Sequence, residues 1–160
     1  MLKITVIAVG KAKEKYLSDA YGEYIKRLSG YCNLNIIELS PCKADESAGK
    51  SATDAAIEDE GNRILAKIPP RALVLPLCIE GKQMPSEKLA ELIKGTAIDG
   101  ISEICFIIGG SYGLSSRVKA AGKLKFSMSE MTFPHQLARL MLLEQIYRAF
   151  KINEGGSYHK

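Results

Sequence analysis

Short apolar runs alternate with amphipathic segments along the chain, and this alternation restricts the possible folds more than any other feature. The runs are rich in Val, Ile and Leu and lie at residues 2–9, 34–39, 72–77, 103–108 and 124–128. Nearly continuous apolar runs are typical of strands that are buried on both faces, as in parallel sheets. The sequence therefore predicts an α/β fold in which a parallel-type sheet is flanked by helices on both faces.

Helical segments fill the intervals between these runs. After the first run, apolar side chains recur every four residues, which predicts an amphipathic helix over 15–29 that includes Tyr16, Ala20, Tyr24 and Leu28. Four further helices are expected over residues 51–67, 86–94, 115–121 and 134–151. Ser51 and Thr132 are candidate helix caps, and residues 80–82 are expected to turn. No repeat or linker interrupts the pattern, so one domain over residues 1–160 is expected.

The last helix has apolar residues on two sides. One side holds Leu137, Leu140 and Met141, and the other holds Leu142, Leu143, Ile146 and Phe150. A helix that only covers a sheet needs a single apolar side. The helix is therefore either central to the core or packed between its own sheet and a second subunit. We favour the second arrangement, which predicts a homodimer.

Positive charge is concentrated in the last third of the chain. The whole chain has a formal net charge of +4, which is too small to identify a partner. Residues 111–160 carry 8 basic and 3 acidic residues, a net charge of +5, whereas residues 1–110 carry −1. The basic residues are Arg117, Lys119, Lys123, Lys125, Arg139, Arg148, Lys151 and Lys160. They form either a solvated face or a docking surface for an anionic partner, in which case they should surround the site.

Several protein classes are disfavoured. No apolar run is long enough to span a bilayer, and residues 1–10 lack the basic leader and cleavage site of a signal peptide. The four cysteines have no Cys-x-x-Cys spacing, so free thiols are expected rather than disulfides or a zinc site. The chain is therefore expected to be cytoplasmic, with no metal and no membrane partner.

Three segments could carry chemistry. The glycine-rich turn 107–114 would let a ligand approach the backbone closely, but Ile108 replaces the first glycine of Gly-x-Gly-x-x-Gly, which disfavours a nicotinamide-dinucleotide site. The loop 127–135 combines hydroxyls, a carboxylate and apolar side chains, which suits a ligand with polar and apolar parts. The tail 153–160 either frays or uses its aromatic and basic residues to stack on a base and contact phosphate.

Together these segments resemble the RlmH family of SPOUT-class methyltransferases. The matching motifs are FIIGGSYGLS at 106–115, SMSEMTFPH at 127–135, LLEQIYRAF at 142–150 followed by Tyr158-His159, and VIAVGK at 6–11. The resemblance covers the whole chain and implies S-adenosylmethionine as methyl donor, a homodimer and a C-terminal trefoil knot. Sequence pattern alone would not suggest the knot, because threaded chains are almost absent from proteins. The implied substrate is N3 of a pseudouridine in 23S ribosomal RNA, with the assembled ribosome as preferred target.

The resemblance also implies site residues. The donor site would consist of Leu77, Gly109, Gly110, Ser129, Glu130, Met131, Thr132, Phe133 and Pro134. Backbone groups of the two loops would bind adenine edges, and the apolar side chains would bury the rest of the donor.

Catalytic candidates lie near the C-terminus, and they are Arg148, Tyr158 and His159. Arg148 could stabilise the negative charge on the base or hold a phosphate, and His159 could accept a proton if the tail folds over the site. Glu144 and His135 are weaker candidates for the base. Two alternatives remain open, namely a nucleotide-dependent oxidoreductase on a doubly wound sheet and a noncatalytic ribosome-associated module.

Overall fold

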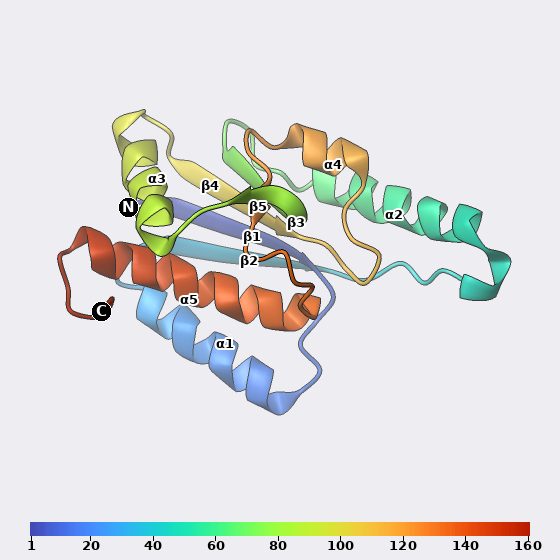
Figure 1. Ribbon diagram of the computed structural model, residues 1–160, viewed down its shortest axis with the longest axis horizontal. Coiled ribbons are helices and arrows are strands. Elements are labelled where there is room, and N and C mark those ends of the chain that lie inside the picture. Colours follow the sequence, from blue (N-terminus) through green and yellow to red (C-terminus); the bar gives the residue numbers. More distant parts are fainter.

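Five parallel strands form the sheet at the centre of the computed structural model, which describes residues 1–160 (Figure 1). They are β1 (Lys3–Val9), β2 (Asn33–Leu39), β3 (Leu73–Gln83), β4 (Glu103–Ile108) and β5 (Phe126–Ser127), in the order β2-β1-β4-β3-β5. Every strand pair is parallel. The predicted α/β class and the parallel sheet are confirmed.

Helices cover both faces of this sheet, as the sequence predicts. They are α1 (Lys15–Leu28), α2 (Lys50–Leu65), α3 (Ser86–Ile98), α4 (Ser116–Ala121) and α5 (His135–Asn153), with a 3₁₀ turn η1 (Glu46–Ala48). Side chains of β1 alternate between two cores, because successive residues of a strand point to opposite faces. Ile4 and Val6 pack with α1, α3 and α5, whereas Ile7 packs with α2 and α4 (Figure 1).

One apolar side of α5 lies in the larger core. Leu142, Leu143 and Ile146 are fully buried there, and α1 and α3 flank the helix. On the other side Leu137 is exposed, and Leu140 and Met141 are only partly buried. This second side is the one that the homodimer prediction assigns to a partner subunit.

The side of α1 that is most deeply buried differs from the predicted one. Tyr16 is 70% exposed, and the buried residues of α1 are Leu17, Tyr21 and Leu28. Two apolar series run along this helix, and the one that contains Tyr21 faces α5, where the Tyr21 hydroxyl donates to the Gln136 carbonyl at 2.5 Å. The spacing predicts the helix correctly, but of its series only Leu28 is fully buried, and Tyr24 is partly buried against the larger core.

Strand β3 is longer than expected and runs through the turn predicted at residues 80–82, but its register against β5 shifts just there, because Leu77 and Lys82 both pair with Phe126. The strand continues to Gln83 because β5 supplies a partner for its second half: the Lys82 amide donates to the Lys125 carbonyl at 2.8 Å. Gly81 lies directly against this partner, since a Cβ at Gly81 would be 2.7 Å from the Lys125 oxygen. The extension places Lys82 beside the chain that leads into β5.

Neither predicted helix cap forms. Helix α2 begins at Lys50 after Gly49, which has φ +87°, so Ser51 lies inside the helix. Helix α5 begins at His135 after Pro134 and has no side-chain cap, so Thr132 does not fill that role. The trefoil knot stays a prediction of the resemblance. No helix has the length and apolarity needed to cross a membrane.

Candidate active site

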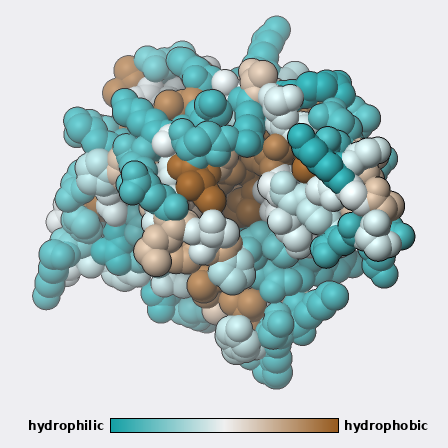
Figure 2. All heavy atoms as spheres, turned by 45° about the vertical axis from the view of Figure 1, so that its right-hand side comes forward, coloured by the Kyte–Doolittle hydropathy of each residue, from teal (hydrophilic) through white to brown (hydrophobic).

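A pocket of about 230 Å³ lies beyond the carboxyl ends of β4 and β5 and beside the middle of β3. Open α/β sheets bind ligands at this edge. Figure 2 shows a hollow with hydrophobic side chains inside and hydrophilic ones around it. Of the predicted donor-site residues, the ones that line the pocket are Leu77, Gly109, Gly110, Ser129, Met131, Thr132 and Phe133. Glu130 and Pro134 belong to the same loop but do not line it.

The glycine-rich turn forms one side of the pocket with its backbone. Gly113 has φ +81°, and its amide donates to the Gly110 carbonyl at 3.1 Å, which closes the turn. Gly109 packs against this closed turn, because a Cβ there would lie 2.8 Å from the Gly113 carbonyl carbon. The turn therefore needs glycine and leaves its main chain open to a ligand.

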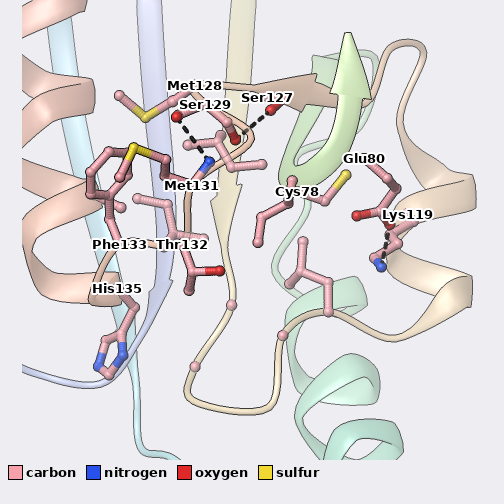
Figure 3. Close-up of a pocket in the computed structure, with 18 residues that line it drawn as sticks. Cys78, Glu80, Lys119, Ser127, Met128, Ser129, Met131, Thr132, Phe133 and His135 are labelled. Carbon is pink, nitrogen blue, oxygen red and sulfur yellow. Dashed lines mark hydrogen bonds and ion pairs between the residues drawn. The ribbon is translucent and has the colours of Figure 1, made fainter. Parts of the chain in front are cut away.

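The loop 127–135 forms a second side and leaves most of its backbone unpaired. The Ser127 hydroxyl donates to the Ser129 carbonyl, and the Met131 amide donates to the Ser129 hydroxyl, both at 3.0 Å (Figure 3). The other backbone amides and carbonyls of residues 128–133 have no hydrogen-bond partner in the chain. These groups can bind the edges of a polar ring while neighbouring apolar side chains cover its faces.

Sequence reasoning missed the side of the pocket opposite this loop. Cys78, Glu80 and Lys119 lie there, across from Thr132 and Phe133 (Figure 3). Glu80 and Lys119 form an ion pair at 2.5 Å, and the lysine lowers the pKa of the Glu80 carboxyl. The sequence places Lys119 in the basic last third of the chain but does not indicate that it lines a pocket.

His135, at the start of α5, closes the base of the pocket. It packs against Gly10, whose φ is +100°. Behind it the buried Arg139 donates to Glu38 at 3.0 Å and to the Gly10 carbonyl at 3.3 Å, with its guanidinium 4.5 Å from the Tyr21 ring centre. Arg139 therefore fastens the start of α5 to the ends of β1 and β2 and is not part of a basic surface.

Stability between pH 7 and pH 5 is expected to depend on His135. Burial and the nearby positive charge of Arg139 lower the pKa of His135 from its usual value near 6.5. The unfolded chain therefore takes up the proton first as the pH falls, and the free energy of unfolding decreases below about pH 6.5. Urea unfolding of His135→Gln should show a smaller decrease over this range. Above pH 7.5 the free energy of unfolding should depend on pH equally in the wild type and the variant. If the two proteins also showed the same pH dependence below pH 6.5, the loss of stability could not be assigned to His135.

The three catalytic candidates form a separate cluster. Arg148 donates to Glu144 through Nε at 3.0 Å, and the Tyr158 hydroxyl donates to the same carboxylate at 3.1 Å. The Arg148 guanidinium lies 4.8 Å from the Tyr158 ring centre. Burial is the main reason that the pKa of Tyr158 rises to about 12, so this hydroxyl stays protonated.

His159 is held by two contacts that fix its tautomer. Its Nδ1 lies 3.2 Å from Nη1 of Arg148, and its Nε2 lies 2.8 Å from Oε1 of Glu87. A guanidinium can only donate, so Nδ1 of a neutral ring accepts from Arg148 and Nε2–H donates to Glu87. The tail is thereby attached to α3 and α5 of its own chain.

Within one chain this cluster does not reach the pocket. Arg148 follows His135 by thirteen positions, which is about 20 Å along a helix. In Figure 1 the tail lies at the far end of α5 from the start of that helix. The tail therefore does not fold over the pocket of its own chain, because the helix α5 separates them. The eight basic residues of the last third are likewise distributed between the two places: Lys119 lines the pocket, and Arg148 lies in the cluster at the tail.

Known proteins match the chain over nearly its whole length. The family described as "Predicted SPOUT methyltransferase" matches residues 2–159. A Streptococcus sanguinis protein named ribosomal RNA large subunit methyltransferase H is 49% identical over 159 residues, which is 99% of this chain and 100% of that protein. Proteins of the same name from Leuconostoc mesenteroides and Bacillus pumilus are 48% and 50% identical with the same coverage. Because these matches include both the pocket and the tail, the chain belongs to the SPOUT methyltransferases and, within them, to the RlmH family.

Proposed function

We propose that this methyltransferase transfers a methyl group from S-adenosylmethionine to N3 of a pseudouridine in 23S ribosomal RNA, on the assembled ribosome and in the cytoplasm. The observation that carries the proposal is the pocket itself, which is lined by unpaired backbone groups and apolar side chains from the family motifs. Membership of the family favours methyl transfer over the oxidoreductase alternative.

The pocket residues fit the chemistry of the donor. Backbone groups of residues 128–133 would pair with adenine, while Leu77, Met131 and Phe133 would cover its apolar parts. The main chain at Gly109 and Gly110 would contact the ligand directly, because no side chain intervenes. When bound, the donor supplies a methyl group that its sulfonium already activates. The protein then has to hold the accepting nitrogen in line with the methyl carbon, and such positioning can contribute roughly 7–11 kcal/mol.

The accepting N3 must also lose its proton. Arg148 could stabilise the anionic base, and His159 could take the proton on Nδ1, its unprotonated nitrogen, once Arg148 no longer donates to it. These groups lie about 20 Å along α5 from the pocket of their own chain. We therefore infer a homodimer in which the tail of one subunit completes the pocket of the other, with the exposed side of α5 in the interface.

Two linked measurements test the proposal. Calorimetry with S-adenosylmethionine should show saturable binding of about one donor per pocket. Mass analysis of 23S ribosomal RNA from cells that lack the protein should show one pseudouridine without its methyl group, and the purified enzyme should restore it on ribosomes. Ribosome binding without donor binding would instead support the noncatalytic module.

A further inference from the structure

A groove lined with lysines adjoins the pocket, and nothing in the proposed reaction uses it. Its volume is about 450 Å³, and its basic residues are Lys82, Lys119, Lys123 and Lys125. Glu80 and Lys119 line both cavities, so their ion pair separates the pocket from the groove. We propose that this lysine groove binds the RNA backbone phosphates next to the nucleotide that is methylated. The inference rests on the proposed function, because it assumes that the base enters the adjoining pocket.

The charge of the groove is largely uncompensated. Glu80 is its only acidic residue, and it is already paired with Lys119. Lys82, Lys123 and Lys125 are exposed and form no ion pair in the chain. Three free ammonium groups in one concave surface are complementary to a chain of phosphates rather than to a single anion.

Backbone pairing fixes the position of these lysines. Lys82 lies on β3, where its amide donates to the Lys125 carbonyl at 2.8 Å, and the Lys123 amide donates to the Val74 carbonyl at 3.1 Å. The three lysine side chains therefore project from one rigid stretch of backbone. Each side chain is flexible and can adjust to a phosphate.

Two glycines let β3 and the segment that leads into β5 pack closely together beneath the groove. A Cβ at Gly122 would overlap Cδ of Pro76, and one at Gly81 would lie 2.7 Å from the Lys125 oxygen. Larger residues at either position would push β3 away from the segment that leads into β5. The groove is thus built into the sheet edge and is not formed by mobile surface side chains.

Lysine contacts of this kind would hold the RNA without reading its sequence. Phosphate contacts fix the position and register of a nucleic acid, whereas base contacts select the sequence. The groove would set where the strand lies, and the adjoining pocket would receive the base. Ribosome affinity should therefore depend on the groove, and donor affinity should not.

The test compares two triple variants with equal loss of charge in the full-length protein. Lys82→Gln/Lys123→Gln/Lys125→Gln removes the free lysines of the groove, and Lys26→Gln/Lys67→Gln/Lys94→Gln removes three exposed lysines that form no ion pair on other helices and loops. The groove variant should bind ribosomes about 10- to 100-fold more weakly, and the salt dependence of log K should flatten by about 2 to 3 units. Its KM for ribosomes should rise more than kcat falls, and calorimetry should give unchanged donor binding.

Three outcomes would overturn the proposal. Equal ribosome binding by the two variants would show that the groove does not hold RNA. Weaker donor binding by the groove variant would show that the lysines act through the pocket. Tight binding of inorganic phosphate alone, lost in the groove variant, would identify a site for a single anion. Failure of the wild-type protein to bind the donor would instead contradict the proposed function, and the calorimetry separates the two cases.

Discussion

Replacing Gly109 by alanine is expected to weaken the binding of S-adenosylmethionine about 10- to 100-fold, and methylation should fall at least as much. The added Cβ would lie 2.8 Å and 2.9 Å from the carbonyl carbon and oxygen of Gly113, and these backbone atoms cannot swing aside as a flexible side chain can. The turn must therefore shift, and the main chain that faces the pocket shifts with it. Calorimetry with the donor measures the loss directly.

A second glycine provides the matched control. Gly95 lies inside α3, where an added Cβ meets nothing within 4 Å. Alanine there should leave donor binding unchanged and should stabilise the helix by about 0.5–1 kcal/mol. If Gly109→Ala bound the donor as well as Gly95→Ala does, the glycine-rich turn would not be part of the donor site.

The continuous apolar runs were sufficient to predict the sheet and its two helical layers. A run such as residues 103–108 is typical of a strand that is buried on both faces, and its apolar pattern can be read from neighbouring residues alone. The length of β3 was not predictable in this way. Its second half is a strand because the Lys82 amide donates to the carbonyl of Lys125, forty-three positions later. No local sequence pattern indicates such a distant partner.

The site residues also fall into those that the sequence identifies and those that only the fold brings together. Gly109, Gly110 and the loop 129–134 were found because the resemblance to a known family identifies them. Lys119 was not found, because its partner Glu80 is 39 positions away and the two meet only once α4 packs beside β3. A charge count treats Arg139 as a surface cation, but a carboxylate of β2, 101 positions away, lets it be buried. Charge alone therefore does not indicate which basic residues can meet RNA.

Removing residues 157–160 is expected to reduce methylation at least about 100-fold and to change donor affinity less than about twofold, because the tail does not line the pocket. The deletion removes Tyr158 and His159 but leaves Arg148 paired with Glu144 through the helix. The deletion breaks the exposed His159–Glu87 contact and the Tyr158–Glu144 hydrogen bond, and both lie at the end of the chain, so the fold should tolerate the loss. Single-turnover methylation of ribosomes and donor calorimetry on the same preparation separate the two effects. Full activity of the shortened protein would remove the tail from the mechanism.

Mixing two strongly impaired variants distinguishes a shared site from one built within a single chain. In a dimer of one Gly109→Ala subunit and one shortened subunit, one site combines both defects and the other combines an intact pocket with an intact tail. Half of the dimers in an equal, fully exchanged mixture are of this kind, so about a quarter of wild-type activity should return. A site built within one chain would give no recovery, because every subunit in the mixture carries one of the two defects. The separation of about 20 Å along α5 predicts recovery, and an inactive mixture with proven subunit exchange would contradict the shared site.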